Sequence, residues 1–364
     1  MNDMKVLIVD DSAFMRKMIT DFLHGFRGIE VAGTAKNGSE ALEQIKKLSP
    51  DVITMDVEMP VMDGMAALKK IMENDPRPVI MLSSTTQKGA EETITALENG
   101  AVDFVAKPSG AISLDLYKVR DELREKVLQT AFAKIIGPED REKHKDFPRS
   151  LEKYSKICTV REKNPVFNSG IRHFRPVICI GTSTGGPRAL QRVLPMLPSK
   201  LDAPVFIVQH MPQGFTASLS ERLDKLCKIR VKEAADGERA EAGTAYIAPG
   251  GSHLTVIQKG TSLYVKVERS AIRNGHRPSV DVLFESISQT EGFRHIAVIM
   301  TGMGSDGTKG LSLLKQKGNT YSIAESEQTS VVFGMPKSAI GEKLVDSIDH
   351  VDHIAEKIMH YMQS

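Results

Sequence analysis

The chain has 364 residues, of which 41% are hydrophobic and 26% are charged, and its formal net charge is +2. This composition predicts a globular protein of two domains, and the small net charge argues against a dominant nucleic-acid or membrane-surface role. No apolar run approaches the ~20 residues of a membrane span, and the first residues lack the apolar core of an export signal, so we expect a cytoplasmic protein without membrane insertion. The 3 cysteines are scattered without metal-ligand or disulfide spacing, which suits a reducing compartment.

Short apolar runs alternate with amphipathic patterns in the first third of the chain, from Lys5 to about Lys134. The expected buried strands cover residues 6–9, 29–32, 52–55, 78–82 and 103–106. Helical patterns such as 39–47 and 65–72 lie between them. This alternation predicts a parallel sheet with helices on both faces.

Acidic side chains stand at the ends of two of these strands, with Asp10 and Asp11 after the first and Asp56 after the third. Because the carboxyl ends of parallel strands meet at one edge of a sheet, the three carboxylates should converge there. They would repel one another unless a hard cation such as Mg²⁺ lay between them, and Lys107 could reach the same pocket. The alternative, that Asp10 and Asp11 only cap the next helix, does not account for four charged residues at three strand ends.

Residues 5–120 resemble a response-regulator receiver domain, through the segments VDDSAFMRK, MDVEMPVMDG, MLSS and AKPSG in that order. The resemblance implies that Asp56 is the residue that accepts phosphate. It also implies that Asp11, Asp56 and the backbone carbonyl of Glu58 hold Mg²⁺, with Asp10 helping through water.

The same resemblance implies three switch residues, namely the hydroxyl of Ser83, the ring of Phe104 and the amine of Lys107, which contacts the phosphoryl group. The chemistry agrees with it, because an aspartate can attack phosphorus when a metal and a lysine neutralise the phosphoryl oxygens.

The composition and the hydrophobic pattern change after Ile136. The segment GPEDREKHKDFPRSLEKYSK is strongly charged, and no strand pattern follows until Pro176. This predicts a linker, approached by a helix that starts near Leu114. We therefore expect a receiver domain at 1–125, a helix end and interdomain linker at 126–174, and a catalytic domain at 175–364.

Apolar runs at 177–180, 205–209, 245–248 and 295–300 predict a second α/β unit. The expected fold class is therefore α/β, with two doubly wound domains, each a mainly parallel sheet flanked by helices, joined by the charged linker.

The segment PVICIGTSTGGPRAL, residues 176–190, places Ser183 between glycines where a strand gives way to a helix. In that context G-x-S-x-G predicts an exposed nucleophile on a sharp turn, with backbone N–H groups able to face an anion. A phosphate cradle is disfavoured, because neither G-x-G-x-x-G nor Gly-Lys-Ser/Thr spacing is present. A merely structural glycine turn stays open on this motif alone.

A nucleophilic serine needs a base, and the useful candidates are His210, His253 and His276. His210 ends APVFIVQH and therefore lies at the same sheet edge as Ser183. The other two histidines lie in polar segments whose position relative to that edge is unclear, so His210 is favoured.

The acid of the triad is expected in HIAVIMTGMGSDG, where Asp306 follows a buried strand and glycines. Asp281 precedes an apolar run and is expected to cap or orient a helix instead. The order Ser183, His210, Asp306 differs from the Ser…Asp…His order of α/β-hydrolases, which disfavours that fold and retains the chemistry.

Residues 176–340 resemble the catalytic domain of the chemotaxis protein-glutamate methylesterases. The resemblance rests on IGTSTGGPRAL, VQHMPQGFTASLSERL, YIAPGGSHL, RPSVDVLF, MTGMGSDGTKG and VVFGMPK. Thr182 stands where alanine is frequent, and Glu325-Ser326 where Gln-Asp is frequent; neither departure touches the triad.

This resemblance implies hydrolysis of glutamate methyl esters on chemoreceptors, deamidation of receptor glutamines, and phosphate supplied by a chemotaxis histidine kinase. Backbone N–H groups near Thr184 and Met303 are the candidate oxyanion donors. Mg²⁺ is expected for phosphorylation of the receiver, and no metal for ester hydrolysis.

Two other classes of function were weighed. A receiver-controlled transcription factor would need a recognition helix and a basic face, whereas the second half is glycine-punctuated α/β without a convincing helix-turn-helix pattern. A catalytically dead receptor-binding adaptor is disfavoured by the intact set of Ser183, His210 and Asp306.

Overall fold

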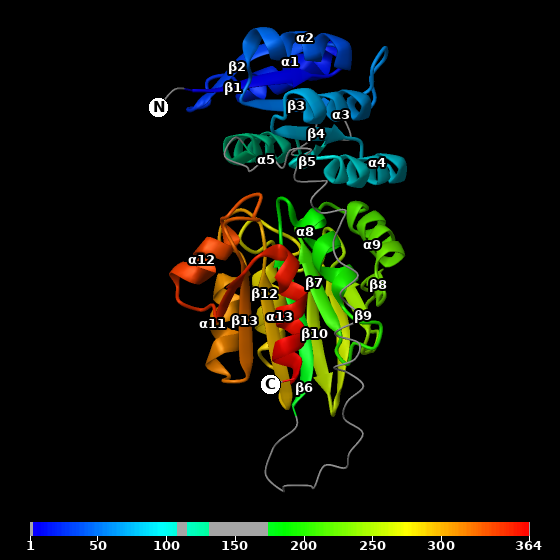
Figure 1. Ribbon diagram of the computed structural model, residues 1–364, viewed down its shortest axis with the longest axis vertical. Helices are drawn as coiled ribbons and strands as arrows, with labels where there is room; N and C mark the ends of the chain where they lie inside the picture. Colours follow the sequence, from blue (N-terminus) through cyan, green and yellow to red (C-terminus); the bar gives the residue numbers. More distant parts are fainter. Residues whose placement is uncertain (1–2, 108–114, 131–173, 364) are drawn as a thin grey trace, which may run out of the picture.

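The structure, a computed structural model, describes residues 3–107, 115–130 and 174–363 (Figure 1). Most of the expected linker, residues 131–173, lies outside the described residues. No helix in the described ranges is long and apolar enough to cross a membrane.

A five-stranded parallel sheet with the order β2-β1-β3-β4-β5 forms within residues 3–107. Its strands are β1 (Met4–Val9), β2 (Ile29–Ala35), β3 (Val52–Asp56), β4 (Val79–Ser83) and β5 (Asp103–Ala106). The helices are α1 (Ala13–Leu23), α2 (Gly38–Leu48), α3 (Gly64–Asn74), α4 (Gln87–Glu98) and α5 (Asp115–Thr130). All five strands were predicted from the sequence, although β2 extends beyond Ala32.

Strand β1 shows how both faces of this sheet become buried. Leu7 and Val9 pack in a cluster with α2, α3 and α4, whereas Val6 and Ile8 pack with α1 and α5. Successive side chains of a strand point to opposite faces, so an unbroken apolar run requires helices on both sides. The first predicted domain is therefore doubly wound.

The second half contains a seven-stranded parallel sheet with the order β14-β13-β12-β6-β7-β9-β8 within residues 174–363. Its strands are β6 (Arg175–Thr182), β7 (Val205–Gln209), β8 (Arg230–Glu233), β9 (Thr244–Ile247), β12 (Phe293–Ile299), β13 (Thr320–Glu325) and β14 (Ser347–Asp349). A separate antiparallel hairpin joins β10 (His253–Lys259) to β11 (Ser262–Glu268). The sequence prediction missed β8, β13, β14 and the hairpin.

Helices cover both faces of this sheet as well (Figure 1). They are α8 (Gly186–Val193), α9 (Phe215–Leu226), α10 (Val280–Ile287), α11 (Thr308–Gln316), α12 (Met335–Gly341) and α13 (Val351–Gln363), with a 3₁₀ turn, η2, at Leu194–Met196. Alternate residues of β6 show the division, because Ile178 packs with α8, α9 and α13 and Cys179 packs with α10, α11 and the hairpin. The expected fold class of two doubly wound α/β domains is confirmed.

The strand order places a topological switch point in each sheet. In the first sheet the chain leaves β1 to one side for β2 and reaches β3 on the other side; in the second, β7 and β12 flank the central strand β6. Ligands of open α/β sheets bind in the crevice outside the carboxyl ends of the strands at such a point. The strand order therefore predicts where the functional side chains of each domain should gather.

Candidate active site

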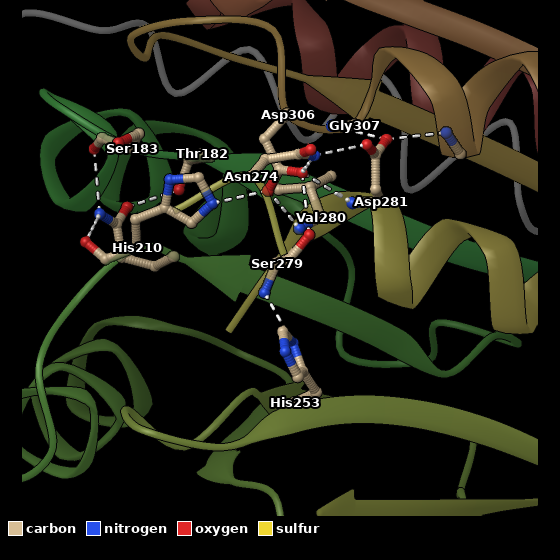
Figure 2. Close-up of polar contacts among 12 residues, drawn as sticks. Thr182, Ser183, His210, His253, Asn274, Ser279, Val280, Asp281, Asp306 and Gly307 are labelled. Carbon is tan, nitrogen blue, oxygen red and sulfur yellow. Dashed lines mark hydrogen bonds and ion pairs between the residues drawn. The ribbon is translucent and has the colours of Figure 1, made fainter. Parts of the chain in front are cut away.

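Three polar side chains lie at the switch point of the second sheet. Ser183 follows β6 directly, His210 follows β7 directly, and Asp306 lies in the loop between β12 and α11. Figure 2 shows them in a row, with His210 between the other two. The structure thus brings together the three residues that sequence analysis chose as nucleophile, base and acid.

The turn around Ser183 is held tightly by backbone and side-chain contacts. The Ser183 N–H donates to the Thr301 carbonyl at 3.0 Å, and the Ser183 carbonyl accepts from Gly186 N at 2.8 Å and from Gln209 Nε2 at 2.9 Å. Gly186 must be glycine here, because an added Cβ would lie 2.0 Å from the side-chain oxygen of Gln209. Gly185 has a φ of 78°, which glycine adopts without strain. The chain can therefore turn sharply enough to present the serine at the sheet edge.

His210 is hydrogen-bonded through one ring nitrogen only. Its Nε2 lies 2.9 Å from Asp306 Oδ2, whereas Nδ1 is buried and has no hydrogen-bond partner among the described residues. Because an ionised carboxylate can only accept, the proton of a neutral imidazole belongs on Nε2, which leaves Nδ1 as the basic nitrogen. Nδ1 is therefore the ring nitrogen that can act as a base, although no hydrogen bond joins it to Ser183 in this structure.

Asp306 is held by a group of donors from the start of α10 and the loop before it. Asn274 Nδ2 donates to Oδ1 at 3.0 Å, Ser279 Oγ donates to Oδ1 at 2.9 Å, and the Val280 N–H donates to Oδ2 at 2.7 Å (Figure 2). Burial alone would raise the pKa of Asp306, but the hydrogen bonds from His210, Asn274 and Val280 hold that pKa well below its usual range. The carboxylate is therefore ionised near neutral pH and held in position by these donors.

Asp281 and His253 have supporting positions beside this group. Asp281 Oδ1 accepts from the N–H groups of Gly307 at 3.0 Å and Gly310 at 2.8 Å, so it caps the start of α11, which confirms the expectation that it orients a helix. His253 is fully buried, its Nδ1 accepts from Ser279 N at 3.2 Å, and its Nε2 lies 2.9 Å from the Ala271 carbonyl. Both ring nitrogens are occupied, so this histidine has no free base to offer.

The sequence does not predict where His276 lies relative to the sheet edge. In the structure its ring lies against that of His210. Its ring stacks on that of His210 with 3.8 Å between ring centroids and 12° between planes. Burial, together with the neighbouring charge of His210, lowers the pKa of His276 to about 4. At pH 7 the His276 ring is therefore neutral, and it covers one face of the His210 ring. The position of His276 could not be predicted from the sequence, because the polar segment around it has no periodic pattern.

The candidate oxyanion donors lie on two loop segments beside Ser183. Thr184 is the next residue along the turn, and its carbonyl accepts from Thr301 Oγ1 at 2.9 Å. Met303 follows Gly302, where an added Cβ would lie 2.8 Å from Ser183 Cβ, so this loop passes directly against the nucleophile. Both backbones are close enough to the serine for the predicted role, which stays a prediction.

The acidic pocket of the first domain lies at its own switch point. Ligand oxygens of Asp10, Asp11 and Asp56 all lie within 4.8 Å of one another, and Lys107 Nζ lies 2.9 Å from Asp10 Oδ2 and 2.8 Å from Asp56 Oδ2. Burial raises the pKa of Asp56 to about 6, against the opposing effect of Lys107. Three carboxylates with a single lysine leave excess negative charge, and hard oxygen ligands of this kind fit Mg²⁺. Helix α1 is capped by Ser12, whose Oγ accepts from Met15 N at 3.4 Å, so the aspartates are not needed as caps.

The remaining residues predicted for the receiver surround this pocket. The Ser83 hydroxyl is buried and donates to the Gly89 carbonyl at 2.9 Å. The side chain of Glu58 is exposed and pairs with Lys88 at 2.9 Å, which lowers the pKa of Glu58. Only its backbone carbonyl is then a candidate metal ligand, as the sequence analysis had it.

Phe104 is buried at the boundary between the two domains. Its ring stacks on that of Phe215, at the start of α9, with centroids 4.6 Å apart. Its neighbour Asp103 accepts a hydrogen bond from Thr184 Oγ1, directly beside Ser183. Strand β5 of the first domain therefore touches the turn that carries the candidate nucleophile.

A polar contact extends this boundary along α4, which lies beside α8 and α9 (Figure 1). Glu98 accepts from Arg222 Nε at 2.7 Å and from Gln191 Nε2 at 2.9 Å. The side of the first domain formed by its edge strand β5 and by α4 therefore lies against the carboxyl edge of the second sheet.

Comparison with known proteins agrees with this arrangement. Residues 178–358 match the CheB methylesterase family, and residues 6–116 match the response regulator receiver domain. A protein-glutamate methylesterase/protein-glutamine glutaminase of Bacillus licheniformis is 55% identical over 99% of this chain and 98% of its own length. Its counterpart in Bacillus subtilis is 51% identical over 97% of each chain.

A solved structure is similar to the second domain. The crystal structure of the CheB methylesterase catalytic domain of Thermotoga maritima is 44% identical, with a TM-score of 0.50, and covers 51% of this chain and 97% of that chain. The chain therefore belongs to the CheB methylesterase family, with a response regulator receiver domain in front of the esterase domain.

Proposed function

We propose that this chain is a receiver-controlled protein-glutamate methylesterase and protein-glutamine glutaminase that acts in chemotaxis adaptation, with Ser183, His210 and Asp306 as its catalytic triad. Family membership and the names of the relatives support the reaction. The observation that carries the residue roles is the environment of His210, whose Nε2 lies 2.9 Å from Asp306 Oδ2 and whose buried Nδ1 has no hydrogen-bond partner within the described part of the chain.

In the first half of the reaction Ser183 Oγ attacks the ester carbonyl of a methylated glutamate while His210 Nδ1 takes its proton. Asp306 stabilises the imidazolium that forms. The N–H groups near Thr184 and Met303 would receive the developing oxyanion, a contribution that typically amounts to ~10²–10³ in rate. The C–O bond to methanol then breaks, and the imidazolium returns its proton to the leaving oxygen.

In the second half His210 deprotonates a water molecule that attacks the acyl-serine. The products are free Ser183 and a glutamate carboxylate. A primary amide reacts by the same route with ammonia as the leaving group, so receptor glutamines would become glutamates. Every step of this scheme uses side chains and backbone of the second domain, without a cofactor.

Phosphorylation of Asp56 by a chemotaxis histidine kinase would control this activity. Asp11, Asp56 and the Glu58 carbonyl would hold Mg²⁺, with Asp10 helping through water, and the ion would supply neutralising charge for the phosphoryl oxygens. Lys107, already 2.8 Å from Asp56, would pair with the phosphoryl group. Ser83 and Phe104 would then move, as switch residues of a two-state domain.

The substrate implied by this chemistry is the cytoplasmic helical domain of a chemoreceptor, so we place the reaction in the cytoplasm. Methanol release from methylated receptor membranes tests the function directly. A transcription factor or an inactive adaptor would release none, and an active triad would release methanol in proportion to enzyme. Ammonia release from receptors that carry glutamine at the same sites tests the second activity.

Replacing Asp306 with asparagine is expected to lower the rate of methanol release by about 10³–10⁴-fold and to leave a measurable remainder. An amide donates where the carboxylate accepts, so His210 would lose the partner that fixes its tautomer. The measurement is kcat with receptor membranes. Asp346→Asn is the matched control, because that carboxylate pairs with Lys315 at the far edge of the sheet and should leave kcat unchanged. A variant at 306 with more than a tenth of the normal rate would contradict the assignment.

Deleting residues 1–140 is expected to raise the basal esterase rate about tenfold, in line with a coupling free energy of roughly 1–2 kcal/mol. The contacts of Asp103 with Thr184 and of Phe104 with Phe215 support this, since they cover the candidate nucleophile. Phosphorylation should raise the rate of the whole chain and leave the truncated chain unchanged. Equal basal rates would argue against occlusion, and a slower truncated chain would indicate a receiver that activates by docking.

A further inference from the structure

A buried carboxyl group lies beneath the loop that supports the candidate nucleophile. Glu325 ends β13, next to β12 in the sheet, and its residue is 1% exposed. Its Oε2 accepts the backbone N–H of Thr301 at 2.8 Å, and Thr329 hydrogen-bonds the same carboxyl group. This group takes no part in the triad chemistry described above.

Thr301 connects that carboxyl group to the nucleophile turn through two further hydrogen bonds, and a third joins it to Val332. Its carbonyl accepts the Ser183 N–H at 3.0 Å, its hydroxyl donates to the Thr184 carbonyl at 2.9 Å, and the same hydroxyl accepts Val332 N at 3.0 Å. The N–H that donates to Glu325 and the carbonyl that accepts from Ser183 flank the same Cα, so both contacts depend on the position of the Thr301 backbone. A displacement of this residue would therefore shift both Ser183 and Thr184.

Glu325 forms no ion pair with a cation among the described residues. The charge of Arg192 of α8 lowers the pKa of Glu325, but Arg192 Nη2 pairs with Asp352 of α13 at 2.6 Å, and the charge of Asp352 raises that pKa. Asp349 lies opposite Glu325 in the register of β13 and β14, and Lys357 lies 4.0 Å from Asp349. Burial raises the pKa of Glu325 to about 7, so both forms of the group are populated near neutral pH.

We propose that Glu325 is a positioning residue for the nucleophile, whose carboxylate form fixes the Thr301 peptide and whose protonation loosens it. A hydrogen bond to an ionised acceptor is roughly twice as strong as one to a neutral acceptor. The esterase rate is then coupled to pH through a group other than His210. This inference rests on the assignment of Ser183 as nucleophile made above.

The test compares the whole chain, without phosphodonor, with Glu325→Gln, which keeps the shape of the side chain and removes its charge. At pH 8 we expect kcat of the variant to be five- to tenfold lower, with KM within twofold. The ratio of the two kcat values should fall towards one as pH decreases through 7. Effects of pH that are common to both proteins cancel in this ratio.

A stability measurement separates positioning from a purely structural role. The folded-state pKa of Glu325, about 7, lies above the ordinary value of 4.5, so the native chain should lose stability as pH rises through that range. Glu325→Gln should therefore melt at a higher temperature than the native chain at pH 8, and the difference should vanish below about pH 5. A more stable but slower variant is the expected outcome.

Glu327→Gln is the matched control, because Glu327 is exposed two residues further along and should show the native profile. A constant kcat ratio at every pH, or equal rates at pH 8, would overturn the proposal. Ser183→Ala in the same pH series keeps the two claims apart. If that variant retains activity, the nucleophile assignment fails; if it is inactive while Glu325→Gln follows the native profile, this inference alone fails.

Discussion

Ser183→Ala is expected to lower methanol release by about 10⁴–10⁶-fold, which is the range for loss of a serine nucleophile from a working triad. Without Oγ no acyl-enzyme can form, and His210 Nδ1 has nothing to activate except water. The fold should be unaffected, because the turn is held by backbone atoms of Ser183 and by Gln209 rather than by the hydroxyl. Methanol release and the melting temperature are to be measured on the same preparation.

Ser288→Ala provides the control for this prediction. Ser288 follows the far end of α10, is 1% exposed, and donates to the Glu285 carbonyl at 2.7 Å, so its loss also removes a buried hydroxyl. It should keep the native rate. Turnover of Ser183→Ala within tenfold of the native rate would remove the nucleophile assignment.

Asp56→Asn is expected to abolish incorporation of phosphate from a small donor or a histidine kinase in the presence of Mg²⁺. The amide cannot attack phosphorus, and it also removes one of the three carboxylates within 4.8 Å that would hold the metal. Basal methanol release should stay at the native level while its stimulation by phosphodonor disappears. Both are measured with the whole chain, with and without Mg²⁺.

Glu58→Gln is the informative comparison. The proposed ligand at this position is the backbone carbonyl, and the exposed side chain contacts Lys88 only at the surface, where an ion pair contributes little. This variant should be labelled normally. Unchanged labelling of Asp56→Asn would show that another residue accepts the phosphate.

Much of both sites could be predicted because most candidate residues lie at or just beyond the carboxyl end of a buried strand. Short runs of Val, Ile and Leu located the ends of β1, β3, β6, β7 and β12, and parallel strands bring such ends to one edge. The choice of His210 over His253 rested on this argument alone, and the structure places only the former against Asp306. Apolar runs and the polar residues at their ends are local patterns, so they can be read directly from the sequence.

The strand order and the loop before α10 could not be predicted. Which strands flank β6 depends on contacts between distant segments, and no local pattern encodes it. The same applies to Asn274, His276 and Ser279, which reach the triad from a polar loop without periodicity. The β10–β11 hairpin did leave a signal, since Leu254, Val256, Leu263 and Val265 alternate with polar residues on either side of the turn at Gly260.

The contact of α4 with α8 and α9 joins two domains of one covalent chain. The affinity needed to keep these domains together is therefore lower than for two separate proteins. Two domains of one chain meet at an effective concentration set by their covalent connection, on the order of 1 mM for a short flexible connection, whatever the amount of protein in the cell. A contact with an intrinsic Kd of about 0.1 mM would then be closed in about nine molecules of ten. A few interactions such as Glu98 with Arg222 and Phe104 with Phe215 suffice for that. We expect a contact of that strength to be weak enough for one phosphoryl group on the receiver to open it.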